Sequence, residues 1–197
     1  MINYFEETLE TINESLNSLD RNMVEKLIGE CQSCVENGGK IIATGLGKNV
    51  PICEKFVGTL NSLGIDAAFL HTNTAIHGDL GVVKKNDIVL LLSKSGNTSE
   101  SVFLANHIIE RGTNLWLLTF SDNCELIKIC SPNNSLIMKL KNEGDLWDIV
   151  PNNSTTIYLI LLQYIAIELQ KRMNISIIDF KSNHPGGGIG KKLKDVK

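Results

Sequence analysis

The stretch IVLLLSKSGNTSE, residues 88–100, joins a wholly apolar run to a cluster of short polar side chains. The five apolar residues at its start do not alternate with polar ones, which is typical of a strand buried on both faces of a parallel sheet. The run breaks around Gly96, which permits a tight turn, and apolar residues return at helical spacing from Val102. The stretch therefore predicts a buried strand, a turn and a helix, the repeating unit of a parallel α/β fold.

The turn in this stretch is a candidate anion site. The first N–H groups of a helix lack partners within the helix, and the helix dipole places partial positive charge there. Phosphate groups bind at such positions, and nearby hydroxyl groups add donors. The residues that would surround the anion are Ser93, Ser95, Gly96, Asn97 and Thr98. Lys94 is close enough to assist. The alternative is an ordinary capped helix, because serine and threonine are common N-caps.

Length and charge favour a single domain that binds a small anion. The 197 residues are enough for one sheet with its helices. The formal net charge is −3 and the basic residues are scattered, so neither a nucleic-acid partner nor a membrane partner is indicated. Five cysteines, an odd number, are most simply interpreted as reduced thiols of a cytoplasmic protein. The first residues lack a secretory signal pattern, and no apolar run reaches membrane-spanning length.

Apolar spacing predicts helices before, between and after five strands. Two amphipathic helices, residues 3–18 and 21–36, come first and make residues 1–38 an N-terminal helical segment. The predicted strands are residues 40–45, 67–70, 88–92, 113–120 and 134–140. Together the elements predict an α/β fold in which a doubly wound, five-stranded parallel sheet is flanked by helices, over residues 39–197 of a single domain.

Three local features complete this prediction. Asp122 is expected to cap a short helix. The helix that follows Pro151, through Met173, is apolar on most sides, so we expect it to be buried or shared with a partner subunit. Residues 183–190 are too rich in glycine to continue a helix, and they are expected to display His184 on a turn.

Further polar side chains follow the other strands. Lys48 comes after the glycine turn of the first strand, His71 after the second, and Glu143 after the last. Because parallel strands share one carboxyl edge, these side chains should lie on the same edge as the anion site. The glycine turn does not complete a dinucleotide-binding motif, since Val50 stands where its third glycine belongs, so a nicotinamide cofactor is not expected. His71 and His77 are six residues apart and cannot form a metal pair on one helix face.

The motif Ser93-x-Ser95-Gly96-x-Thr98-x-Glu100 resembles the phosphosugar loop of the sugar isomerase (SIS) domain. More narrowly, the chain resembles the arabinose-5-phosphate isomerases over residues 5–195. The motifs that carry this narrower likeness are Gly45-x-Gly47-Lys48, His71, His77-Gly-Asp-Leu-Gly81, Glu143, Pro151-x-x-Ser-Thr155 and His184-Pro-x-Gly. The resemblance implies a flavodoxin-like SIS sandwich, a homotetramer, and the short form of the family that lacks cystathionine-synthase-like (CBS) repeats.

The activity that the resemblance implies is reversible conversion of D-ribulose 5-phosphate to D-arabinose 5-phosphate through an enediolate, without a required cofactor. This reaction supplies Kdo biosynthesis and thereby lipopolysaccharide. The residues that match catalytic positions of the family are Lys48, Glu100, Glu143 and His184. Those that match substrate-binding positions are Gly47, Lys48, His77, Ser93, Ser95, Gly96, Asn97, Thr98, Ser154 and Thr155. His71 matches a position that can bind an inhibitory zinc ion.

The chemistry needs acid and base groups more than a cofactor. Moving a carbonyl between C1 and C2 removes a proton from carbon and returns one to the neighbouring carbon. His184, Glu143 or Glu100 is expected to transfer the proton, while Lys48 stabilises the developing oxyanion. The chain departs from the family at Lys94, where an uncharged residue is frequent, and after Lys48. Two other functions stay open, a different phosphosugar isomerase of the hexulose phosphate type and a non-catalytic module that senses a sugar phosphate.

Overall fold

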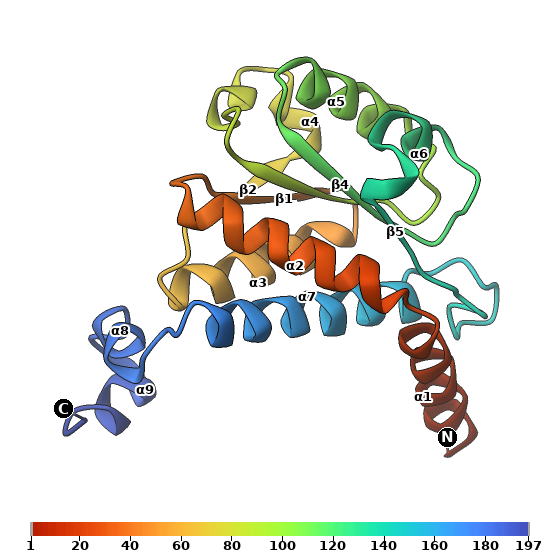
Figure 1. Ribbon diagram of the computed structural model, residues 1–197. Coiled ribbons are helices and arrows are strands. Elements are labelled where there is room, and N and C mark those ends of the chain that lie inside the picture. Colours follow the sequence, from red (N-terminus) through yellow and green to blue (C-terminus); the bar gives the residue numbers. More distant parts are fainter. Residues whose placement is uncertain (1, 197) are drawn as a thin grey trace.

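Five parallel strands form one sheet in the order β2-β1-β3-β4-β5 in the computed structural model, which describes residues 2–196 (Figure 1). The strands are β1 Ile41–Gly45, β2 Ala67–His71, β3 Ile88–Leu92, β4 Asn114–Thr119 and β5 Ser135–Ile137. β3 lies at the centre, where Leu92 is in register with Gly45 of β1 and Leu118 of β4. The expected five-stranded parallel sheet is therefore confirmed.

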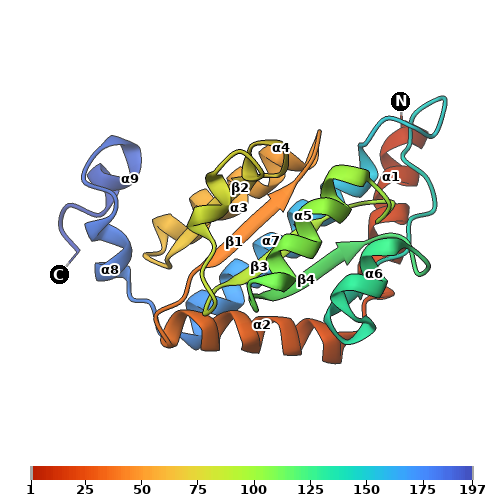
Figure 2. The same ribbon diagram turned by 90° about the horizontal axis from the view of Figure 1, so that it is seen from above.

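Helices cover both faces of the sheet (Figures 1 and 2). They are α1 Ile2–Asn17, α2 Arg21–Glu36, α3 Asn49–Ser62, α4 Thr72–Ala75, α5 Ser99–Glu110, α6 Glu125–Cys130, α7 Asn153–Arg172, α8 Ile177–Ser182 and α9 Gly187–Lys192, with short 3₁₀ helices η1 Asp79–Val82 and η2 Pro132–Asn134. One face carries α2, α3 and α7, and the other carries α4, α5 and α6. This is the doubly wound arrangement that the alternating pattern predicts.

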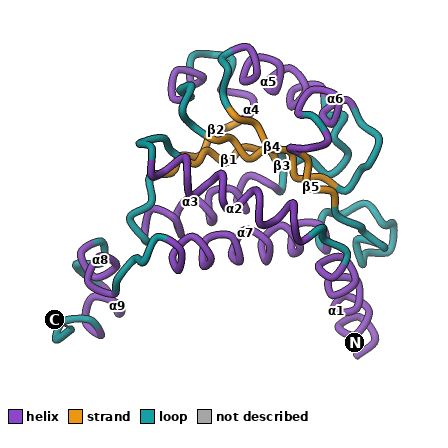
Figure 3. Tube along the Cα trace, viewed as in Figure 1, coloured by secondary structure: helices purple, strands orange, loops and turns teal. Residues whose placement is uncertain are grey.

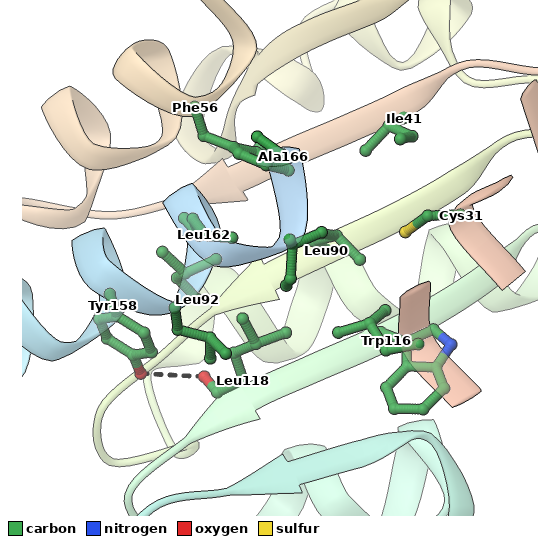
Figure 4. Close-up of a cluster of buried hydrophobic side chains, with 14 of the residues drawn as sticks. Cys31, Ile41, Phe56, Leu90, Leu92, Trp116, Leu118, Tyr158, Leu162 and Ala166 are labelled. Carbon is green, nitrogen blue, oxygen red and sulfur yellow. Dashed lines mark hydrogen bonds between the residues drawn. The ribbon is translucent and has the colours of Figure 1, made fainter. Parts of the chain in front are cut away.

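The core consists of two apolar layers separated by the sheet. Residues of β3 alternate between them, because successive side chains of a strand point to opposite faces. Leu90 and Leu92 belong to the layer under α2, α3 and α7, which Figure 4 shows in part. Val89 and Leu91 belong to the layer under α5 and α6. The absence of polar residues in this strand is thus explained by burial on both faces.

Helix α7 is fixed beneath the end of β4. The hydroxyl of Tyr158 donates a hydrogen bond of 2.9 Å to the carbonyl oxygen of Leu118 (Figure 4). The Tyr158 ring also packs edge-on against Phe120. Tyr158 is fully buried, so the bond satisfies a hydroxyl that would otherwise be costly to bury. The contact holds the second turn of α7 at the carboxyl edge of the sheet. The expected burial of this helix is confirmed, although Tyr164 and Ile167 remain exposed.

Three local expectations were wrong. Asp122 does not cap α6, because the N-cap residue is Cys124 and the amide oxygen of Asn97 accepts from the backbone N–H of Glu125 at 2.9 Å. A tertiary contact therefore replaces the local cap. The last strand ends at Ile137, so Glu143 lies in the loop before α7 and not directly after a strand.

The glycine-rich segment near the end of the chain also differs from expectation, since Gly187–Lys192 forms the short helix α9. A Cβ atom at Gly190 would lie 2.6 Å from the carbonyl oxygen of His184, so the missing side chain lets this helix fold back closely on the turn. Glycine permits this close packing, and the packing outweighs the low helix propensity of glycine. Among the residues described, every helix is too short or too polar to cross a membrane.

Candidate active site

A cavity of about 740 Å³ opens at the carboxyl edge of the sheet, where the chain leaves β1 and β3. The strand order reverses between these two strands, and doubly wound sheets bind ligands outside such a reversal. The cavity is lined by residues that follow β1, β3 and β4 and by the loop between β5 and α7, which Figure 3 shows beside α1. Its polar lining includes Asn49, Ser93, Ser95, Asn97, Thr98 and Ser101.

The loop after β3 is held in shape by its own hydroxyl groups. The N–H of Ser93 donates to the carbonyl oxygen of Leu118 at 3.1 Å, which continues the sheet into the loop. The hydroxyl oxygen of Ser93 accepts from the N–H of Gly96 at 3.2 Å, and that of Ser95 accepts from the N–H of Asn97 at 3.3 Å. Each hydroxyl keeps its own O–H for donation, so the loop can offer donors to a ligand.

Gly96 is the residue that allows the loop to turn. Its φ angle of +65° lies in the left-handed region, where residues with a Cβ are strained. A Cβ at this position would also overlap the Sγ of Cys124. The loop and the segment before α6 therefore pack too closely for any other residue.

Helix α5 begins at the cavity without a side-chain cap. Thr98 occupies the N-cap position with extended backbone, and within residues 2–196 its hydroxyl bonds to no first-turn N–H. The helix has 12 residues, and its dipole adds partial positive charge at this end. Glu100 lies in the first turn, where its own backbone N–H and the Ser99 hydroxyl hold the pKa of the carboxyl below its usual value. The expected anion site therefore has the geometry that anion binding needs.

Glu143 is a fully buried carboxylate with a donor on every side. Its Oε1 accepts from the Ser154 hydroxyl at 2.7 Å and from the Lys94 ammonium at 2.6 Å. Its Oε2 accepts from the backbone N–H groups of Ser154 at 2.9 Å and Asn152 at 3.1 Å. Burial by itself raises the pKa of Glu143, but the bonds from Lys94 and Ser154 outweigh it, so the pKa lies below its usual value. Glu143 thus joins the loop after β3, through Lys94, to the start of α7.

The ionised state of Glu143 should make stability depend on pH. Because the folded pKa lies below the ordinary 4.5, Glu143 stabilises the fold fully above that pH, and the contribution is lost as the pH falls through the folded pKa. We expect Glu143→Gln to be less stable than the original chain at neutral pH, and the difference to shrink in acid. Urea unfolding at about pH 7 and about pH 4 measures this. An equal difference at both pH values would contradict it.

The other residues expected in the site lie along the same edge. Lys48 is exposed at the N-cap position of α3, after Gly47 with its φ of +58°, and its neighbours Leu46 and Asn49 line the cavity. His77 and Glu100 line a second hollow of about 510 Å³ beside the start of α5. His77 and Glu100 therefore line a hollow at this edge, whereas Lys48 lines neither hollow and is only a chain neighbour of residues that do.

His71 lies apart from both hollows. It caps α4, since its Nδ1 accepts from the N–H of Asn73 at 3.3 Å, and it lines a different hollow with Asp79. Over residues 2–196, no three histidine, cysteine, aspartate or glutamate side chains are close enough to hold a metal ion.

The hydroxyls of Ser154 and Thr155 already have partners at the start of α7. That of Ser154 donates to Glu143, and that of Thr155 donates to the carbonyl oxygens of Pro151 at 3.1 Å and Asn152 at 2.9 Å. These residues shape the cavity through Glu143 and the helix start.

His184 is not brought to this edge within one chain. It lies between α8 and α9, at the opposite end of the molecule from the loop before α7 (Figures 1 and 2). The neighbouring Asn183 donates to the carbonyl oxygen of Ser62 at 3.3 Å, at the far end of α3. The 14 residues of that helix span about 20 Å from the cavity. The expectation that all the groups meet at one edge thus fails for His184 in the single chain.

Ser101 and Asp148 are among the cavity residues that sequence reasoning missed. Ser101 is 1% exposed and follows Thr98 by three residues, so helical spacing could have identified it. Asp148 lines the cavity and accepts from the N–H of Glu143 at 2.6 Å, with a φ of +57°. No sequence pattern indicates that contact.

Comparison with known proteins gives consistent matches over nearly the whole chain. The SIS domain family matches residues 35–169. An uncharacterized protein of Helicobacter pylori is 37% identical over 94% of this chain and 55% of its own length. Arabinose 5-phosphate isomerase KdsD of Pseudomonas aeruginosa is 32% identical over 91% of this chain and 55% of its own length. The chain thus spans just over half the length of these curated relatives.

Among solved structures, an E. coli CFT073 protein in complex with arabinose 5-phosphate superposes with a TM-score of 0.85. It is 31% identical to this chain, and the match covers 92% of this chain and 94% of that one. The family match and these relatives lead to one conclusion. The chain belongs to the SIS domain family.

Proposed function

We propose that the chain is an aldose–ketose isomerase that interconverts D-ribulose 5-phosphate and D-arabinose 5-phosphate. The observation that carries the proposal is one cavity lined by the serine loop at the uncapped start of α5 and by Lys94, whose ammonium pairs with the buried Glu143. The first can hold a phosphate, and the second places charge beside the sugar. The similarity to KdsD proteins and to the complex with arabinose 5-phosphate supports this choice of sugar.

The proposed reaction uses acid and base groups at this edge. A base removes the proton from C2 of the aldose, the C–H electron pair forms the C1–C2 double bond, and the π pair of the C1 carbonyl moves onto O1. O1 then gains a proton, O2 loses its proton as the carbonyl forms at C2, and C1 takes a proton to give the ketose. Glu100 and His184 are the candidate proton carriers, and Lys48 would stabilise the oxyanion from the edge of the cavity. The reaction requires no cofactor. The product would supply Kdo biosynthesis.

The proposal is tested by incubating the protein with a panel of pentose and hexose phosphates and identifying the products. We expect ribulose 5-phosphate to give arabinose 5-phosphate, and unphosphorylated arabinose to react far more slowly. Preferred conversion of a hexulose phosphate would contradict the proposed sugar. Equal rates with and without the phosphate group would contradict the role of the serine loop.

Ser95→Ala should chiefly weaken binding of the phosphate group. The substitution removes one O–H donor from the loop and the acceptor for the N–H of Asn97. Hydrogen bonds to charged groups contribute about 1.5 to 3 kcal/mol, so we expect KM to rise by about 10- to 100-fold. Steady-state kinetics on ribulose 5-phosphate measures this, with Ser33→Ala, on α2 and outside the cavity, as the control. An unchanged KM would remove Ser95 from the phosphate site.

We further propose that the chain works as a homotetramer in which a neighbouring copy supplies His184 to the cavity. Exposed apolar side chains support an assembly, since Leu146 is 90% and Trp147 is 70% exposed in the loop before α7. Phe5 and Leu9 of α1 are also exposed, and Lys141 of that loop pairs with Glu10 of α1 at 3.0 Å. Together they place an apolar surface beside the cavity, of the kind that subunit contacts cover.

A further inference from the structure

Lys94 stands at the border between the phosphate loop and the rest of the cavity. Its backbone carbonyl oxygen accepts from the N–H of Phe120 and from the Thr119 hydroxyl, both at 3.1 Å, so its backbone is fixed to the end of β4. Its side chain is 41% exposed, lines the cavity, and places Nζ 2.6 Å from Oε1 of Glu143. The ammonium is therefore held in one place by a buried partner while it stays accessible from the cavity.

The two partners of this ion pair differ in how many further hydrogen bonds they can form. Each oxygen of Glu143 accepts two hydrogen bonds, from Lys94 and the Ser154 hydroxyl on one and from two backbone N–H groups on the other. A carboxylate has about four lone-pair sites, so Glu143 can take a substrate proton only by giving up one of these donors. An ammonium has three N–H donors, and only one is directed at Glu143. Lys94 is therefore the member of the pair that can form a further hydrogen bond to a ligand.

The direction of the side chain decides which part of a ligand Lys94 would meet. The phosphate-binding groups lie at the start of α5, whereas Glu143 is bonded to the start of α7. The Lys94 side chain extends from the loop before α5 toward Glu143 at the start of α7. With a phosphate on the serine loop, the ammonium would meet the carbon chain of the sugar and its oxygen atoms.

We propose that Lys94 contacts the substrate by donating a hydrogen bond to a sugar oxygen, and that Glu143 is a positioning residue that fixes this ammonium. The inference rests on the proposed phosphosugar site and deepens it. It gives Glu143 a different role from the proton carrier that the family resemblance implies.

The variant Lys94→Met tests whether Lys94 contacts the sugar or the phosphate group of the substrate. Loss of a charged hydrogen bond costs about 1.5 to 3 kcal/mol, so we expect kcat/KM and arabinose 5-phosphate affinity to fall about 10- to 100-fold. Affinity for inorganic phosphate should stay within about twofold of the original, because its donors are the serine loop and the helix start. Isothermal titration calorimetry measures both affinities. Equal losses for both ligands, or no loss for either, would overturn the proposal.

Lys128→Met is the matched control. Lys128 also makes a 2.6 Å ion pair, with Glu125, but both side chains are exposed on α6 and lie outside the cavity. The substitution removes the same charge and the same length of side chain. Affinity for arabinose 5-phosphate should be unchanged in this variant. A loss as large as that of Lys94→Met would mean that net charge, and not contact with the sugar, explains the effect.

A double-mutant cycle tests the positioning role of Glu143. If Glu143 acts through Lys94, the double variant Lys94→Met with Glu143→Gln should lose no more kcat/KM than the more impaired single variant. Independent losses that multiply would overturn the positioning role. If the original chain binds arabinose 5-phosphate without converting it, the proposed isomerisation fails, yet the two affinity comparisons still decide the sugar contact of Lys94.

Discussion

His184→Ala should reduce turnover of ribulose 5-phosphate by about 10²- to 10⁴-fold, the usual contribution of a group that transfers a proton. The imidazole is suited to that work, since its Nδ1 is fixed 2.7 Å from the carbonyl oxygen of Phe180 and its ring stacks on the Phe180 ring. These contacts leave Nε2 available to a substrate. The fold should be unaffected, because the side chain lies on a turn outside the core layers. Steady-state kinetics and thermal unfolding measure the two effects.

The distance of His184 from the cavity of its own chain allows a second test of its role. Since one chain holds it at the far end of α3, the proposed assembly requires the imidazole of one copy to serve the cavity of another. Mixing His184→Ala subunits with Gly96→Ala subunits, each strongly impaired by itself, should restore part of the activity, because some mixed sites combine an intact loop with an intact histidine. Absence of recovery after verified subunit exchange would contradict a shared site. Near-normal turnover of His184→Ala alone would remove His184 from the mechanism.

Gly96→Ala should lower both stability and activity. A residue with a Cβ in the left-handed region costs about 1 to 3 kcal/mol, and the overlap with Cys124 adds to that cost. Relief of the overlap must move the phosphate loop, and a displacement of about 1 Å can reduce a rate by about 100-fold. We expect urea unfolding to show a loss of about 2 kcal/mol or more and kcat/KM to fall by about 100-fold.

Gly112→Ala is the control for backbone strain alone. Its φ of +70° is close to that of Gly96, but a Cβ there would meet only Lys85 Cε at 3.9 Å, an ordinary contact. This variant should lose about 1 kcal/mol of stability and keep its activity. If both variants lost stability equally and kept their activity, the close packing of Gly96 would have no functional consequence.

Local patterns predict the scaffold of this protein well. The apolar run 88–92 matches β3, and the return of helical spacing predicts α5 after the serine loop. Both patterns involve residues that are close in the sequence, and a strand buried on two faces shows an unbroken apolar run. Lys48 and the serine loop both follow strands of the parallel sheet, and the carboxyl ends of parallel strands lie at one edge. The topology therefore places both at the same edge.

The contacts that define the site depend on residues far apart in the sequence. The pairing of Lys94 with Glu143 follows from the path of the loop before α7, which no periodicity determines. The cap of α6 comes from Asn97 and not from the nearby Asp122 for the same reason. The spacing around His184 predicts a turn but does not tell which end of the sheet the turn lies on. Sequence patterns thus predict elements better than long-range contacts.

The most direct test of the proposed isomerisation is to incubate the protein with arabinose 5-phosphate in D₂O and follow the sugar by NMR. An enediolate passes its carbon-bound proton through an enzyme group that exchanges with solvent, so the account predicts deuterium in the sugar together with ribulose 5-phosphate. Tight binding of the sugar phosphate without deuterium incorporation and without product would contradict it, and would make the chain a module that binds the ligand only.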